Sequence, residues 1–146
     1  MSSFSVFKKI SLVDTPTASN DATTKAYVDA VDGRQVTTIT TANNTPTTVA
    51  TVATTTDTTI LIVSQLTAIR TDVADSNAAF QIRAGFKNTS GTVTQLGADD
   101  LASFVEPLAL PYTVDTSISG TNIIIRVTGE TGHTVDWKAT TYSYVS

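Results

Sequence analysis

Short stretches of alternating apolar and polar residues, separated by turn-forming residues, fill the chain from residue 36 to its end. A strand points successive side chains to opposite faces, so this period of two is typical of half-buried strands. About one residue in five is threonine, whose β-branched side chain suits a pleated surface. We expect strands at residues 36–42, 47–54, 58–69, 78–87, 92–96, 102–110, 112–118, 121–128 and 133–145. Because no long helical pattern intervenes, we predict a mainly β fold, an antiparallel β-sandwich or jelly roll.

Turn-forming residues mark the boundaries between these stretches. Residues 97–100 contain Gly and Asp and are expected to separate two strands. Residues 129–132 begin and end with Gly and are expected to close a β-hairpin between residues 121–128 and 133–145. The stretch at 47–59 is so rich in Thr and Ala that it would also fit a polar edge or a stalk.

Trp137 is the only tryptophan, and it has the same strand parity as Val135. This parity favours a large core side chain shared by two sheets. The alternative is a surface on which a sugar ring stacks, for which Tyr112, Tyr142 and Tyr144 are further candidates.

The N-terminal part has a different pattern. Residues 1–19 are expected to be an extended segment and linker, because Phe4, Val6, Ile10 and Leu12 alternate before a Pro-containing stretch. An isolated terminal strand is not stable alone, so this apolar face docks either on another protein or on its own domain.

Residues 20–35 are expected to contain one short helix, capped by Asn20 or Asp21 and ended by Gly33. A helix of about 11 residues is marginal alone and needs burial against other parts of the protein or other copies. Its narrow apolar stripe would suit packing against copies of itself, and the candidate residues are Ala22, Ala26, Tyr27, Val28 and Val31. The β domain then covers residues 36–146.

Two segments resemble phage proteins. Residues 20–29 have the sequence NDATTKAYVD, which resembles a segment that recurs in bacteriophage tail-fibre and related virion proteins. Residues 127–139, VTGETGHTVDWKA, are more loosely similar to the closing hairpin of phage-fibre β domains. The resemblance implies a homotrimer with a helical neck.

Several function classes lack their usual residues. The net charge of -4 and the pI of 4.7 argue against a nucleic-acid-binding surface. The apolar runs are much shorter than the roughly 20 residues that span a membrane, so no membrane insertion is expected. There is no cysteine, and we expect no cofactor and no metal. The one histidine, His133, is expected to be a solvent-exposed turn residue without a nucleophile beside it. Carboxylates are expected to form turns rather than an acid–base pair; they are Asp72, Asp75, Asp99, Asp100 and Glu106.

The missing residues argue against an enzyme, and the resemblance implies a structural protein of a bacteriophage particle, assembled in the host cytoplasm. It would be a short fibre, head appendage or decoration subunit that binds capsid, neck or tail proteins through its N-terminus. The alternative is a receptor- or carbohydrate-binding module of a tail fibre that contacts a host surface glycan.

Overall fold

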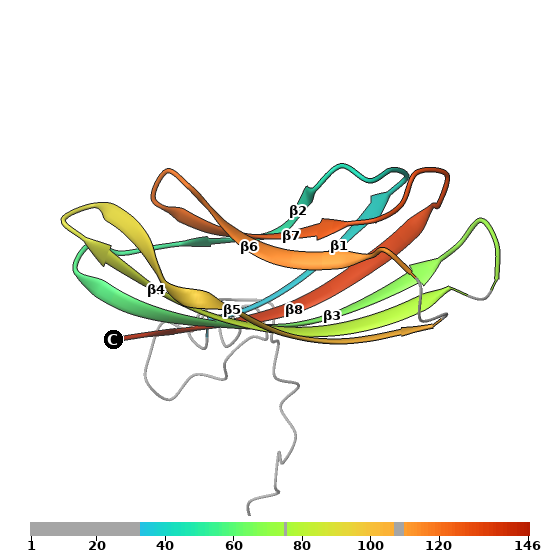
Figure 1. Ribbon diagram of the computed structural model, residues 1–146. Helices are drawn as coiled ribbons and strands as arrows, with labels where there is room; N and C mark the ends of the chain where they lie inside the picture. The colour runs from blue at the N-terminus through green and yellow to red at the C-terminus, as the bar shows by residue number, and fades with distance from the viewer. Residues whose placement is uncertain (1–32, 75, 107–109) are drawn as a thin grey trace, which may run out of the picture.

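The computed structural model describes residues 33–74, 76–106 and 110–146, which form a β-sandwich of two antiparallel sheets (Figure 1). The predicted mainly β fold is confirmed as an antiparallel sandwich, and there is no helix among these residues. The expected N-terminal extended segment and the expected helix lie outside the described residues.

The larger sheet has five strands in the order β1-β8-β3-β4-β5, and the smaller has three in the order β2-β7-β6. Their bounds are β1 (Arg34–Thr41), β2 (Thr47–Ala53), β3 (Thr58–Arg70), β4 (Asn77–Thr89), β5 (Thr92–Glu106), β6 (Thr113–Ser119), β7 (Asn122–Thr128) and β8 (Val135–Val145). The Thr-rich strand β2 lies at an edge of the smaller sheet.

The core lies between the sheets, and the strand alternation decides which side chains enter it. On β8, Val135, Trp137 and Ala139 are buried while the residues between them face outward. β3, β4 and β7 show the same alternation. The largest fully buried side chains are Trp137, Phe86, Ile60, Ile62, Leu66, Ile82, Ile123, Ile125, Val127 and Val135.

The expected break at residues 97–100 was wrong, because β5 runs unbroken from Thr92 to Glu106. Its pairing with β4 shifts instead, since Arg83 lies opposite Asp100 while Gly85 lies opposite Leu96. The extra β5 residues form a bulge, and Gly97 supplies a positive φ of 81°. The turn-forming composition therefore bends a strand here without ending it.

The expected hairpin between residues 121–128 and 133–145 was also wrong. β7 pairs with β2 and β6, whereas β8 pairs with β1 and β3, so the connection crosses from one sheet to the other. Gly129 passes close to β1 at this crossing, where a Cβ atom would lie 2.6 Å from Thr41 Oγ1. A glycine allows this close approach.

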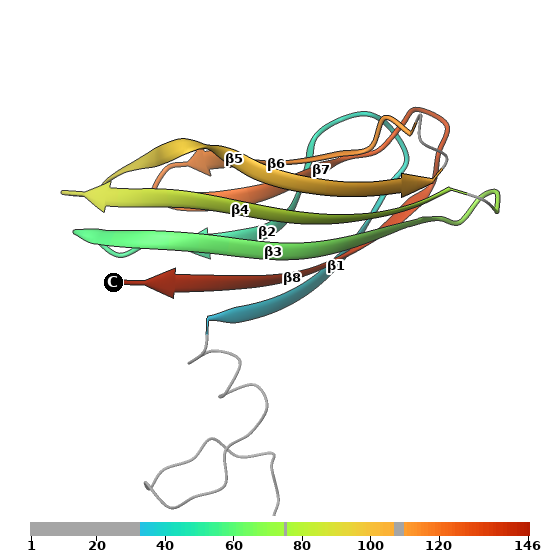
Figure 2. The same ribbon diagram turned by 60° about the horizontal axis from the view of Figure 1, so that its bottom comes forward.

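The two ends of the sandwich differ. The β1–β2, β3–β4, β5–β6 and β7–β8 connections lie together at one end, which we call the loop end. The chain joins β1 at Gly33, beside Ser143 near the end of β8, and the C-terminus lies in the same direction (Figure 2). We call this the terminal end, so the loop end points away from the place where residues 1–32 join the domain.

Candidate functional site

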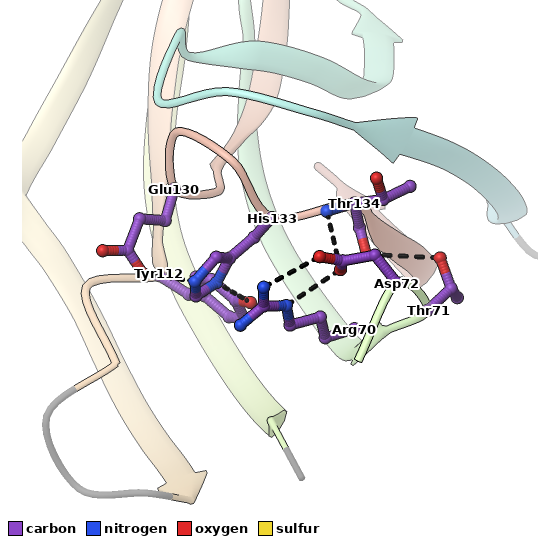
Figure 3. A network of polar contacts seen from close by, with 7 residues as sticks. All are labelled: Arg70, Thr71, Asp72, Tyr112, Glu130, His133 and Thr134. Atoms are coloured by element: carbon purple, nitrogen blue, oxygen red, sulfur yellow. Dashed lines mark hydrogen bonds and ion pairs between the residues drawn. The ribbon is translucent and has the colours of Figure 1, made fainter. Parts of the chain in front are cut away.

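Polar side chains from three connections meet at the loop end (Figure 3). Arg70 ends β3, and Asp72 follows it in the β3–β4 connection. Tyr112 comes just before β6, while Glu130 and His133 lie between β7 and β8. We call these five residues the loop-end cluster.

Arg70 and Asp72 form a two-pronged ion pair. The Arg70 Nε and Nη2 atoms each donate a hydrogen bond of 2.8 Å to the Asp72 carboxylate. Asp72 also accepts the backbone N–H of Thr134 at 3.0 Å, and Thr71 N–H donates to the Thr134 carbonyl at 2.8 Å. The hydrogen bonds from Arg70 hold the pKa of Asp72 well below its usual range. These contacts tie the β3–β4 connection to the β7–β8 connection.

His133 is bonded at both ring nitrogens. The Tyr112 hydroxyl lies 2.8 Å from Nδ1, and a Glu130 carboxylate oxygen lies 3.1 Å from Nε2. Because Nε2 faces a carboxylate it carries a proton, and in the neutral ring Nδ1 accepts the Tyr112 hydroxyl. The expectation that His133 is a solvent-exposed turn residue was wrong, since only 17% of its side chain is exposed.

The cluster rests on the aromatic core. The Tyr112 ring centroid lies 5.9 Å from that of His133 and 5.7 Å from that of Trp137. Burial raises the pKa of the Tyr112 hydroxyl. Trp137 stacks on Phe80 at 6.0 Å, and its indole N–H donates to Thr41 Oγ1 at 2.9 Å. The loop-end polar contacts are therefore continuous with the core.

This arrangement fixes the shape of the loop end. The guanidinium and carboxylate neutralise each other, and both nitrogens of His133 are engaged within the cluster. Among the described residues, no group of three or more His, Cys, Asp or Glu is placed to hold a metal ion. The cluster's contacts join described residues of three connections to one another.

A second feature lies on the outer face of the five-stranded sheet. Three hollows of about 610, 480 and 660 Å³ adjoin there. The first and second hollows share the lining residues Thr67 and Lys138, and the second and third share Ala79 and Phe104. These four residues form one row across β8, β3, β4 and β5, and we call the hollow along this row the transverse trough. The short side chains of Thr67 and Ala79 form its floor, and Phe104, 70% exposed, stands at the β5 end.

The structure places the predicted aromatic candidates in two environments. Trp137 is 1% and Tyr112 is 4% exposed, so neither offers an open ring face to a ligand. Tyr142 is half-buried and Tyr144 is 56% exposed, both on the outer face of the five-stranded sheet.

Asp75 lies outside the described residues, and the described carboxylates among the candidates do not gather into one site. Asp72 belongs to the loop-end cluster, Asp99 bonds to Thr116 and Asp100 pairs with Arg83. The predicted attachment and neck residues lie outside the described residues: Phe4, Val6, Ile10, Leu12, Ala22, Ala26, Tyr27, Val28 and Val31.

Sequence reasoning missed Arg70 and Phe104. Arg70 stands two residues before Asp72, a spacing that allows the ion pair but does not require it. Phe104 is exposed on β5. No motif in the sequence marks it as a candidate binding residue. Within residues 33–74, 76–106 and 110–146, no helix is long and apolar enough to cross a membrane.

No protein-family model matches the sequence, and no curated protein matches it significantly. Among solved structures, the tailspike protein of Acinetobacter baumannii phage AM24 is similar over 80% of this chain and 27% of its own, at 11% identity and a TM-score of 0.36. The tailspike protein of Acinetobacter phage vB_ApiP_P1 is similar over 90% of this chain and 24% of its own, at 15% identity and a TM-score of 0.34. This chain thus spans about a quarter of either tailspike, and both likenesses are distant.

Proposed function

We propose that the chain is a non-enzymatic structural protein of a bacteriophage particle, a short fibre, head appendage or decoration subunit. Its N-terminal residues attach it, and its β-sandwich is exposed. The observation that carries the proposal is the position of Gly33, which joins the phage-fibre-like segment to the sandwich on the side away from the loop end. Attachment through residues before Gly33 leaves the loop end free to face outward.

The junction at Gly33 is held firmly. Its carbonyl accepts the Ser143 N–H at 3.0 Å, and its φ of 64° lies in the region that favours glycine. A Cβ atom at this position would lie only 2.5 Å from the Ser143 carbonyl oxygen. The backbone at Gly33 is therefore fixed against the end of β8.

The proposed partners follow the segments of the N-terminus. Phe4, Val6, Ile10 and Leu12 bind a capsid, neck or tail protein. The apolar stripe within residues 22–31 packs against copies of itself and gives a homotrimer. The assembled protein is located in the virion.

Deletion of residues 1–17 tests the attachment. The truncated protein should keep its melting temperature and strand-rich circular dichroism but be missing from purified particles. Ile10→Asp in the full chain should have the same effect, whereas the neighbouring Ser11→Asp, of opposite strand parity, should incorporate normally. Truncated protein at wild-type copy number on particles would show that attachment runs through the β domain instead. A markedly earlier melt would show that the segment packs on its own domain, because each buried apolar side chain contributes about 1.5–3 kcal/mol.

A second candidate function, binding of a host surface glycan, is favoured by the transverse trough. Gln65 and Gln81 lie opposite each other along one side of it, and their amides can bond to sugar hydroxyls. The exposed Phe104 can stack on the apolar face of a sugar ring. Phe104→Ala should then abolish binding to a glycan array, while Leu101→Ala, on the opposite face of β5, should retain it. Absence of glycan binding by the wild-type protein would exclude this candidate.

A further inference from the structure

Five apolar side chains lie near one another on the outer face of the five-stranded sheet, near its terminal end. They are Leu61, Val63, Leu96, Tyr142 and Tyr144, and we call them the apolar band. Leu61 lies opposite Tyr144, and Val63 lies opposite Tyr142. Leu61, Leu96 and Tyr144 are 45%, 47% and 56% exposed. Contiguous exposed apolar side chains of this kind mark interaction surfaces in soluble proteins.

Gly85 interrupts the band between Leu61 and Leu96, at the point where the pairing of β4 with β5 shifts around the bulge. It pairs with Leu61 on one side and Leu96 on the other, so its missing side chain leaves a notch. Its φ is not in the positive range, and a Cβ atom would meet only Leu96, at an ordinary contact distance of 3.6 Å. A glycine in the interior of a strand weakens the strand and often marks a bulge, as on the neighbouring strand here, or a place where another molecule approaches closely.

The chain itself indicates what approaches. Residues 1–32 join the domain at Gly33, whose carbonyl bonds to Ser143, the neighbour of Tyr144 in the band. In the proposed assembly the copies are held together through residues 22–31, and residue 31 precedes Gly33 by only two residues in the sequence. That assembly would tether neighbouring copies at the terminal end of the sheet, where the band lies.

The charges near the band allow like surfaces to meet. The band itself has no charged side chain, but Arg34 lies opposite Tyr142 and Arg83 lies opposite Val63 in the sheet register. The acidic group closest to the band in the register, Asp100, is paired with Arg83. Two copies can therefore approach here without opposing uncompensated carboxylates, although each carries a net charge of -4.

We propose that the apolar band is the surface through which the β domains of neighbouring copies of this chain contact each other, with the notch at Gly85 receiving a side chain of the neighbour. This proposal rests on the self-association part of the proposed function. It adds a contact between the β domains to the contact expected in the neck.

The test compares Leu61→Lys with Ile69→Lys in the full-length protein. Both residues lie on the outer face of β3 and are 45% and 54% exposed, but Ile69 is at the loop end, outside the band. Sedimentation equilibrium should show an oligomer for the wild type, and self-association weakened by roughly tenfold or more in Leu61→Lys. Ile69→Lys should behave as the wild type. Circular dichroism melts should be alike for all three, since both changes are on an exposed face.

Two further variants keep the test independent of charge. Gly85→Ala fills the notch without a clash within the chain, so it should weaken self-association while leaving the melting temperature of the dissociated protein unchanged or higher. The chain has no cysteine, so single cysteines can also be probed with a maleimide. Leu61→Cys should be labelled much more slowly in the oligomer than Ile69→Cys.

The outcomes separate the possible failures. A wild-type oligomer that Leu61→Lys and Gly85→Ala leave unchanged would overturn the band and leave self-association through the neck intact. A monomeric wild type at micromolar concentration would overturn both the band and the homotrimer. Normal self-association of Leu61→Lys combined with its loss from particles would show that another virion protein covers the band, which also overturns the proposal. Attachment to the particle is decided separately, by the deletion of residues 1–17.

Discussion

Asp99 of β5 accepts two hydrogen bonds from Thr116 of β6, one from the backbone N–H at 2.8 Å and one from the hydroxyl at 2.6 Å. β5 and β6 are edge strands of different sheets, so this carboxylate joins the two sheets along one side of the sandwich. It also satisfies a backbone N–H that points away from β7 on an edge strand. The bulge at residues 97–99 is what brings Asp99 to this position.

Asp99→Ala should lower the free energy of unfolding by about 1.5–3 kcal/mol, because a charge-assisted hydrogen bond is lost and a partly buried N–H is left without a partner. Asp100→Ala is the matched control, since its pair with Arg83 is more than half exposed and should change stability by about 1 kcal/mol or less. Urea unfolding followed by the fluorescence of Trp137, the only tryptophan, measures both. Equal effects of the two substitutions would mean that Asp99 does not join the sheets.

Trp137→Ala should lower the free energy of unfolding by about 3–5 kcal/mol, because the side chain is 1% exposed. This is a large share of the total free energy of unfolding of a typical domain, about 5–15 kcal/mol. Trp137→Phe should cost less, since it keeps an aromatic ring against Phe80 and Tyr112 and loses mainly the hydrogen bond to Thr41. Thermal melts by circular dichroism suit both variants. An unchanged melting temperature for Trp137→Ala would contradict the buried position.

Asp72 should make stability depend on pH in the acid range. Its pKa is lowered in the folded protein, so its ion pair contributes fully above the unfolded pKa of about 4. That contribution should be lost as the pH falls from about 4 toward the folded pKa. Wild type should therefore melt higher than Asp72→Asn at pH 7, and the difference should shrink below pH 4. Asp100→Asn, which removes an exposed pair, should show a much smaller difference at pH 7. A gap between wild type and Asp72→Asn that is constant from pH 7 to pH 2 would exclude this role.

Gly129→Ala should destabilise the protein by about 1–3 kcal/mol through overpacking, because its Cβ would lie 2.6 Å from Thr41 Oγ1 and 3.1 Å from the Asn43 carbonyl oxygen. Gly85→Ala, whose Cβ has room, is the control and should leave the dissociated protein at least as stable. Differential scanning calorimetry compares them. If Gly129→Ala melts with the wild type, the crossing between β7 and β8 is looser than these distances indicate.

The loop-end cluster was largely beyond sequence reasoning. The Tyr112–His133 bond joins residues 21 apart, and the Asp72–Thr134 bond joins residues 62 apart. Each residue type fits a turn or a strand end by itself, which is why His133 and Asp72 were expected to be ordinary turn residues. Their partners depend on which connections share one end of the sandwich.

The sequence by itself determined that the domain is built of strands and, for β7 and β8, which side of the strand faces the core. The alternation of Ile123, Ile125 and Val127, and that of Val135 and Trp137, matches the burial in the folded protein. Side-chain direction in a strand follows from the residue-by-residue geometry of the backbone, so a local pattern is enough to specify it.

Only the tertiary structure decided which strands pair. The alternation in β7 and β8 and the Gly-rich segment at 129–132 are compatible both with a hairpin and with a connection between the two sheets. In the structure the segment connects the two sheets. Likewise, residues 97–100 could either end a strand or form a bulge. They form a bulge because β5 pairs with β4 on both sides of them. Strand pairing is chosen by the total burial and hydrogen bonding of segments far apart in the chain, and a local pattern does not contain that information.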